Sequence, residues 1–249
     1  MMPESNESNF PRISVRPGFH WDRCPAYLFD IDGTLLRSRD RVHFNAFAEG
    51  VRRVTGFEIS LEGVPLAGNT DTAILAEAFR QAGLASALLT ENTAAILTAM
   101  AASVAEHREA LDLVLMPGVK AALAHLARQN ALLGVATGNL EAIGWIKIER
   151  AGLREWFRFG GFSDHYSVRP ELVASAAAKA RQMLAAPTAQ VCVVGDTPRD
   201  IEAARASQLP VIAVATGHYS FEQLDALQPE VCASSLADLL ALASTAPEE

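Results

Sequence analysis

Two aspartates at the end of an apolar segment have the spacing best suited to chemistry. Residues 26–29 are apolar or aromatic, and Asp30, Asp32 and Gly33 follow them at once. In an extended chain alternate side chains share a face, so both carboxylates point the same way. Like charges this close repel each other unless one is protonated or a cation lies between them. Because Gly33 leaves the backbone open to a ligand, we expect an acid pair prepared for a divalent metal.

Residues 30–33, with the pattern Asp-x-Asp-Gly, also resemble the opening of a calcium-binding loop. Such loops place a glycine at the sixth position and a glutamate at the twelfth. Counted from Asp30, these positions hold Leu35 and Arg41, so the calcium-loop interpretation fails. A strand-to-helix turn with two solvated acids remains the alternative for this stretch taken alone.

Composition limits the classes of function. The chain has 249 residues, half of them hydrophobic, with a net charge of −8 and a pI of about 5.3. This acidic balance argues against a nucleic-acid partner. Three scattered cysteines indicate a reducing compartment, and six histidines without paired spacing make a zinc site unfavourable. The first residues lack an export signal, and the uncharged stretch 92–105 is too short to span a bilayer. We expect a cytoplasmic protein without a membrane partner.

Strand-like and helix-like segments alternate over most of the chain. The strand-like runs are residues 26–29, 132–136, 191–194 and 211–215, with a weaker one at 231–233. Helical segments are expected near 142–151, 171–185 and 200–206 and after Ser220, where Gln223 completes a capping box. The alternation predicts an α/β fold, a doubly wound parallel sheet covered by helices on both faces. Ligands of such sheets bind beyond the carboxyl ends of the strands.

Residues 39–112 instead show apolar side chains at helical spacing and no convincing strand. Three apolar stripes predict three helices, the first two ending at Gly56 and Gly83 and the third extending past His107. We therefore expect an N-terminal leader at 1–24, a core made of 25–38 and 113–249, and a helical insertion at 39–112.

Polar residues stand at the ends of the later strands. Thr137, Gly138 and Asn139 follow the second run, where a hydroxyl and backbone N–H groups at a helix N-terminus predict an anion site. Asp196 follows the third run and adds another carboxylate, with Asp200 four residues on. Thr-Gly and Gly-Asp turns at strand ends are each common, and it is their occurrence together in this order that points to a functional site.

Three motifs together resemble the haloacid dehalogenase superfamily. They are Asp30-x-Asp32-Gly-Thr34, Thr137-Gly-Asn139 and Gly-Asp196-x-x-x-Asp200. The resemblance covers residues 26 to about 242 and is greatest to the phosphoglycolate-phosphatase-like branch, which inserts a helical cap where residues 39–112 stand. It implies a doubly wound core with a mobile cap, and Mg²⁺ as the cofactor.

The resemblance also implies roles for the matching residues. Asp30 would be the nucleophile that forms an aspartyl-phosphate, and Asp32 the general acid and base. The remaining roles are phosphate binding by Thr137, Gly138 and Asn139, metal binding by Asp30, the Asp32 carbonyl and Asp196, and support from Asp200 and Thr34. Dehalogenating members carry an aromatic residue and phosphonate-cleaving members an alanine at position 32, so the aspartate favours phosphate esters.

The expected phosphate-binding lysine is replaced. The family often carries Lys-Pro before the helix that leads to the Gly-Asp strand, and here Arg169-Pro170 stands there. We expect Lys147 to pair with Asp30 and the phosphate, because helical side chains lean toward the helix N-terminus and lysine is a compact point charge. Arg169 would then lie at the rim, contacting substrate or cap.

The expected function is a Mg²⁺-dependent phosphatase acting on a small phosphorylated metabolite, as a monomer or homodimer. One alternative is a sugar phosphomutase that uses the same Asp30. A remote one is a signalling receiver domain, which has about half this length and no cap. Residues 68–71 are a candidate specificity loop, although an N-cap at Thr70 or Asp71 explains them equally well.

Overall fold

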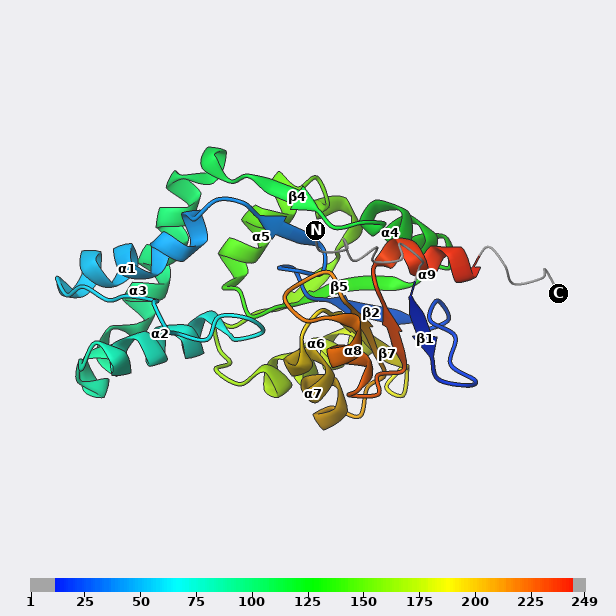
Figure 1. Cartoon of the computed structure of the whole chain (residues 1–249). Helices are drawn as coiled ribbons and strands as arrows, with labels where there is room; N and C mark the ends of the chain where they lie inside the picture. The colour runs from blue at the N-terminus through cyan, green and yellow to red at the C-terminus, as the bar shows by residue number, and fades with distance from the viewer. Residues whose placement is uncertain (1–11, 244–249) are drawn as a thin grey trace, which may run out of the picture.

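The structure is a computed structural model, and it describes residues 12–243 (Figure 1). The first eleven residues of the predicted leader lie outside the described residues. Within the described part, seven strands form one sheet in the order β1-β9-β8-β7-β2-β5-β6. Their bounds are β1 Ile13–Val15, β2 Ala26–Phe29, β5 Leu132–Ala136, β6 Phe159–Gly161, β7 Val191–Gly195, β8 Val211–Val214 and β9 Val231–Ala233. All neighbouring strands are parallel except β1 and β9, so the predicted fold class is confirmed.

The sheet separates two layers of helices, which are visible above and below it in Figure 1. One layer holds α4 (Val119–Arg128), α5 (Glu141–Arg150) and α9 (Leu236–Ala243); the other holds α6 (Arg169–Met183), α7 (Pro198–Ala206) and α8 (Phe221–Asp225). The central strand β2 contributes to both, because side chains alternate along a strand. Tyr27 and Phe29 pack in the first apolar cluster, and Ala26 and Leu28 in the second. This double burial explains why β2 has no charged residue, and the hydroxyl of Tyr27 donates to the Trp21 carbonyl and accepts from the Cys24 N–H.

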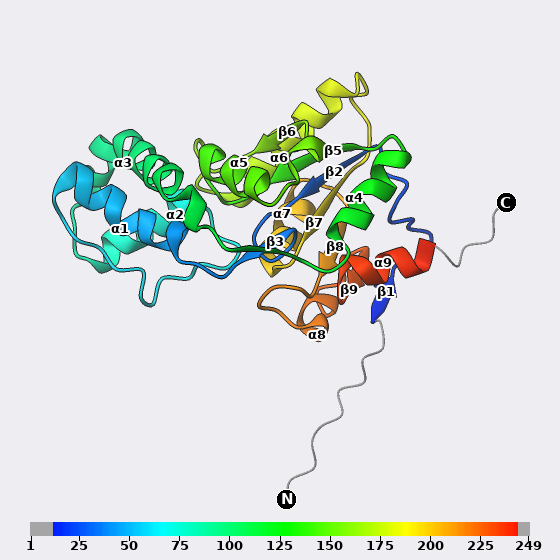
Figure 2. The ribbon, with the colours of Figure 1, turned by 90° about the horizontal axis from the view of Figure 1, so that it is seen from above.

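Three helices form a separate group, called here the helical block (residues 42–106). They are α1 (Val42–Thr55), α2 (Asp71–Gln81) and α3 (Ser86–Glu106), and Figures 1 and 2 show them together on one side of the layers. The block has its own apolar cluster, which also includes Leu140 and Ile143 next to the core. The helix α1 ends at Gly56, which has the left-handed conformation expected of a C-cap. The prediction that the third helix extends past His107 is wrong, because α3 ends at Glu106 and a short 3₁₀ turn, Arg108–Ala110, follows.

A short antiparallel ribbon connects the block to the core. Its strands β3 (Leu36–Ser38) and β4 (Leu113–Leu115) flank the block in sequence. Beyond the ribbon the two connecting segments stay together, since the Asp112 N–H donates to Asp40 Oδ2 at 2.9 Å and the Arg39 N–H donates to the Asp112 carbonyl at 2.8 Å. The block therefore leaves and rejoins the core at one place.

Helix α3 is the one helix of the described residues that is long and apolar enough to cross a membrane, by length and composition alone. It has 21 residues and so exceeds the uncharged stretch considered above. Ile96, Met100 and Val104 on α3 are buried in the apolar cluster of the block.

Candidate functional site

Three buried carboxylates meet at the carboxyl ends of β2 and β7. Asp30 follows β2, Asp196 follows β7, and Asp200 lies in the first turn of α7, with one carboxylate oxygen of each within 4.8 Å of the others. Gly33, with a φ of +89°, carries no Cβ, and one added there would overlap the Asp196 carboxylate. The turn after Asp30 therefore requires glycine for both its conformation and its space. Thr34 Oγ1 donates to Asp196 Oδ1 at 2.9 Å and holds that carboxylate in place.

Crowding alters the acidity of this cluster. Burial raises the pKa of Asp196 to about 8, and repulsion from Asp30 and Asp200 adds to the effect. Burial also raises the pKa of Asp30 to about 6, although the positive charge of Arg169 opposes the rise. A cation held between the carboxylates offsets both the loss of water around their charges and the repulsion between them. Oxygen-only ligands are those that Mg²⁺ prefers, so Asp30 and Asp196 fit this ion.

Asp200 is already occupied by protein donors. Its Oδ2 accepts from the Thr197 N–H at 3.0 Å and from Thr197 Oγ1 at 2.7 Å, which closes a capping box at the start of α7. Its Oδ1 accepts from Arg169 Nη2 at 2.5 Å. Asp200 therefore orients Arg169 rather than facing the cavity with free oxygens.

The structure contradicts the expected rim position of Arg169, although the expected contact with the cap is present, since Nη1 donates to the Gly68 carbonyl of the helical block at 3.2 Å. The side chain is 5% exposed instead of lying at the rim, and its Nη2 is 3.0 Å from Asp30 Oδ1. The reason is that α6 begins at Arg169 itself, two residues earlier than the sequence indicated. The Arg169 side chain therefore leaves the backbone next to the edge of the sheet. Its Nη2 lies between Asp30 Oδ1 and Asp200 Oδ1 while its Nη1 donates to the Gly68 carbonyl, and the single nitrogen of a lysine cannot make contacts from two positions in this way.

Lys147 does reach the site, but the prediction that it pairs with Asp30 is wrong. Its Nζ donates to Asp32 Oδ2 at 2.7 Å and to Asn139 Oδ1 at 2.8 Å, and the structure gives Asp30 to Arg169. Withdrawal from water alone would raise the pKa of Asp32, but the charge and hydrogen bond of Lys147 outweigh it and hold that pKa below its ordinary value. The Asp32 side chain remains 42% exposed. The two acids of the first motif are thus paired with different cations.

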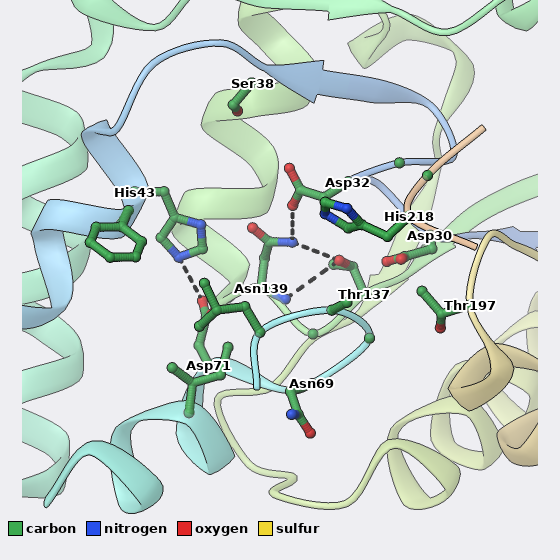
Figure 3. A pocket seen from close by; sticks show the side chains of 18 of the residues that line it. Asp30, Asp32, Ser38, His43, Asn69, Asp71, Thr137, Asn139, Thr197 and His218 are labelled. Atoms are coloured by element: carbon green, nitrogen blue, oxygen red, sulfur yellow. Dashed lines mark hydrogen bonds and ion pairs between the residues drawn. The ribbon is translucent and has the colours of Figure 1, made fainter. Parts of the chain in front are cut away.

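His43 and Asp71 extend this network into the helical block, and the sequence analysis did not identify His43. Lys147 Nζ lies 3.1 Å from His43 Nδ1, which must accept because an ammonium group only donates. The opposite nitrogen, Nε2, then donates to Asp71 Oδ2 at 3.0 Å (Figure 3). The sequence does indicate that His43 faces inward, because it is four residues before buried Phe47 and so shares the inner face of α1.

The first N–H groups of α5 donate to carboxylates of the protein. The Leu140 N–H donates to Asp71 Oδ2 at 2.8 Å, and the Glu141 N–H donates to Asp164 Oδ2 at 2.7 Å. Two protein carboxylates therefore occupy these two donors, which leaves the N–H groups next to Thr137 as the ones expected to hold phosphate. Thr70 is the N-cap of α2, as one of the two interpretations of residues 68–71 required.

Thr137, Gly138 and Asn139 are brought beside Asp30 and Asp32. Asn139 Nδ2 donates to Thr137 Oγ1 at 2.7 Å and to Asp32 Oδ2 at 2.8 Å, so the threonine hydroxyl hydrogen is free to donate elsewhere. A Cβ at Gly138 would overlap the Asn69 carbonyl, and the Gly138 carbonyl accepts from the Asp71 N–H at 2.7 Å. Only glycine lets the loop of the block approach so closely.

These residues line a cavity of about 360 Å³ between the sheet edge and the helical block. Figure 3 shows Asp30, Asp32 and Thr137 on the core side, with His43 and Asp71 facing them from α1 and α2. This volume suits a small ligand. The predicted site residues on the cavity wall are Asp30, Asp32, Thr137, Gly138, Asn139, Lys147, Arg169 and Asp196; Thr34 and Asp200 lie behind them.

Comparison with known proteins identifies the class. A family model described as haloacid dehalogenase-like hydrolase matches residues 24–208. The chain is similar to the probable phosphatase IndB of Dickeya dadantii, with 29% identity over 224 residues that cover 88% of this chain and 93% of that protein. The chain therefore belongs to the haloacid dehalogenase-like hydrolase family. Within it, the chain is a phosphoric monoester hydrolase.

Solved structures agree in fold. A predicted phosphoglycolate phosphatase from Haemophilus somnus 129PT has a TM-score of 0.64 and 19% identity, covering 88% of this chain and 98% of that one. CbbY from Rhodobacter sphaeroides, in complex with phosphate, has a TM-score of 0.58 and 20% identity, covering 79% and 88%. At such identities the likeness concerns the fold alone.

Proposed function

We propose that this protein is a Mg²⁺-dependent phosphatase that hydrolyses a small phosphorylated metabolite through an aspartyl-phosphate on Asp30. The observation that carries the proposal is the position of Asp30. It lies on the floor of a cavity of about 360 Å³, beside Asp196 and paired with Arg169 at 3.0 Å. A carboxylate held by a cation, next to a second carboxylate that can share a metal, is suited to nucleophilic attack on phosphorus.

In the first half-reaction, an Asp30 oxygen forms a bond to phosphorus while the bond from phosphorus to the leaving oxygen breaks. Arg169 favours the ionised, nucleophilic form of Asp30. Arg169 lines the cavity, and its Nε has no acceptor in the described part of the chain. Asp32 gives its proton to the leaving alcohol. When bound, Mg²⁺ supplies positive charge that offsets the charge on the phosphoryl oxygens.

In the second half-reaction, Asp32 acts as the base. It takes a proton from the water that attacks the aspartyl-phosphate, and the bond between phosphorus and Asp30 breaks to release inorganic phosphate. Lys147 lowers the pKa of Asp32 and so favours proton donation in the first half-reaction, which leaves Asp32 as the carboxylate that accepts the proton of water here. Thr137 and the Gly138 backbone line the same floor and can donate to phosphate oxygens.

The test is phosphate release from small phosphate esters in the presence of Mg²⁺. Asp30→Asn, nearly the same size but a poor nucleophile, is expected to abolish turnover while the thermal unfolding temperature shows that the protein is still folded. Wild-type turnover by this variant would contradict the mechanism. Asp32→Asn is expected to lose more activity on alkyl than on activated aryl phosphates, whose leaving groups need little protonation.

The same assay separates the alternatives. A sugar phosphomutase converts a sugar phosphate to its isomer, whereas the proposed phosphatase releases one phosphate for each substrate consumed. A receiver domain keeps its phosphoryl group, so repeated turnover distinguishes the two. Accumulation of an isomeric sugar phosphate without free phosphate would favour the mutase.

A further inference from the structure

We infer that the substrate is a phosphate monoester whose alcohol carries an uncharged, apolar ring or chain, held by the wall of the cavity opposite Asp30. This inference rests on the proposed phosphatase function and names its substrate class. The wall in question belongs to the helical block and the loop within it. Its apolar residues are Phe44, Phe47, Leu61, Leu66, Ala67 and Ile74, which we call the apolar wall.

The two sides of the cavity differ in chemistry. The core side holds the carboxylates, Thr137, Lys147 and Arg169, which suit a phosphoryl group and a metal. The residues of the helical block that line the cavity include no lysine or arginine, within the described part of the chain, and their acid is Asp71. A phosphate bound at Asp30 therefore directs the rest of the ester toward apolar side chains.

The charges around the wall disfavour a second anionic group. A carboxylate there would lose water and meet Asp71, with Asp40 also lining the cavity. Lys147 and Arg169 are already paired with Asp32, Asp30 and Asp200. Arg37 is the remaining lysine or arginine of the cavity lining in the described residues, where two histidines, His43 and His218, also stand; Arg37 is exposed, lies on β3 and donates to the Thr216 carbonyl at 2.9 Å.

One residue of the wall is open to solvent. Leu66 is 39% exposed, although isolated exposed leucines need no explanation. Here it lies in the cavity lining beside five other apolar residues, where a ligand can cover it. Because it is exposed, it can be changed without opening a hole in the apolar cluster, and it is therefore the best probe of the wall.

The test compares two esters that share a two-carbon linker and differ in the group at its end. We expect kcat/KM with Mg²⁺ to be at least about tenfold higher for phenethyl phosphate than for carboxyethyl phosphate, with methyl phosphate as the reference. Leu66→Ala is expected to lower kcat/KM for phenethyl phosphate about threefold or more, and by a clearly larger factor than for methyl phosphate. Leu66→Lys places a cation on the wall and is expected to favour carboxyethyl phosphate. Phe57→Ala is the control, since Phe57 is 48% exposed on the same block but does not line the cavity.

Three results would overturn the inference: equal or better use of carboxyethyl phosphate by the wild type, equal losses for all three esters in Leu66→Ala, or a selective loss of carboxyethyl phosphate in Arg37→Gln. The failure of the proposed function is distinct, because none of the esters would then release phosphate. In that case calorimetry with phenylpropyl and carboxypropyl phosphonates still measures the preference of the wall. Tighter binding of the carboxypropyl compound would contradict it.

Discussion

Arg169 Nη2 lies 3.0 Å from Asp30 Oδ1 and 2.5 Å from Asp200 Oδ1, and the three side chains are buried. The guanidinium thus joins the proposed nucleophile to Asp200, which completes the capping box of α7 with Thr197. A single planar group sets the position of Asp30 relative to the strand-end loop that carries Asp196.

The first prediction concerns that bridge. In Arg169→Lys the charge remains, but a single ammonium nitrogen cannot contact the two carboxylates from the position of Nη2 and the Gly68 carbonyl from the position of Nη1. We expect kcat for a small phosphate ester to fall at least about tenfold, because a small displacement of a nucleophile is costly. The unfolding temperature is also expected to fall. Arg158→Lys, at an exposed position on the core, is the matched control. Unchanged kcat in Arg169→Lys would show that the bridge does not position Asp30.

The second prediction concerns Lys147 and Asp32. Removing the ammonium group in Lys147→Ala takes away the main influence that lowers the pKa of Asp32, so that pKa is expected to rise. Carboxyl ¹³C chemical shifts measured against pH report the change, with the Asp32 signal assigned through Asp32→Asn. Lys179→Ala removes an exposed lysine and should leave the titration as in the wild type. A titration that does not move in Lys147→Ala would contradict the pairing.

The third prediction is that stabilisation by Mg²⁺ depends on pH. The pKa of Asp196 is about 8 in the folded protein and 3.8 ordinarily, so between these values the folded state binds a proton that the unfolded state lacks. The stability of the metal-free protein should therefore fall as pH rises from about 4 to about 8. Mg²⁺ replaces that proton, and its increase of the unfolding temperature should be larger at about pH 8 than at about pH 6.

Asp196→Asn provides the control for this effect. It removes the titrating group, so most of the pH dependence and of the Mg²⁺ response should disappear, with ionic strength matched by a monovalent salt. An equal Mg²⁺ response at both pH values in the wild type would rule out Asp196 as the pH-dependent ligand.

The fourth prediction concerns Asp71, which we first considered a specificity residue. It is 3% exposed, accepts from His43 Nε2 and the Leu140 N–H, and so anchors the helical block to the N-terminus of α5. Asp71→Asn should destabilise the protein by about 1–2 kcal/mol. It should also change kcat/KM by a similar factor for all esters. A change confined to one class of ester would restore the specificity role.

The buried strands could be predicted from the sequence because each is an apolar run long enough to be recognised without knowledge of the strands it pairs with. The runs at β2, β5, β7 and β8 are of this kind. The strands it missed have three residues each, and their pairing depends on the partner. In β6, Phe159 packs over Gly134 of β5, a contact between residues distant in sequence. The ribbon of β3 and β4 likewise joins segments separated by the whole helical block.

The site shows the same limit. The motif residues could be placed because parallel strands bring their carboxyl ends to one edge of the sheet. The choice between Lys147 and Arg169 could not be made, because it depends on where α6 begins, and helix ends are uncertain by a residue or two from sequence. His43 was missed because its partners, Asp71 and Lys147, lie 28 and 104 residues away.

The antiparallel pairing of β1 with β9 has a consequence for folding. Ile13 lies opposite Ala233, and Arg16 joins Glu230 through a side-chain contact at 2.6 Å beside this pairing. This edge of the sheet therefore forms only after nearly all of the described chain has been synthesised, and closing so long a loop is slow. Until then β8 presents an unpaired edge on which other nascent chains can add. The last strand to emerge thus determines how long the growing polypeptide remains open to aggregation.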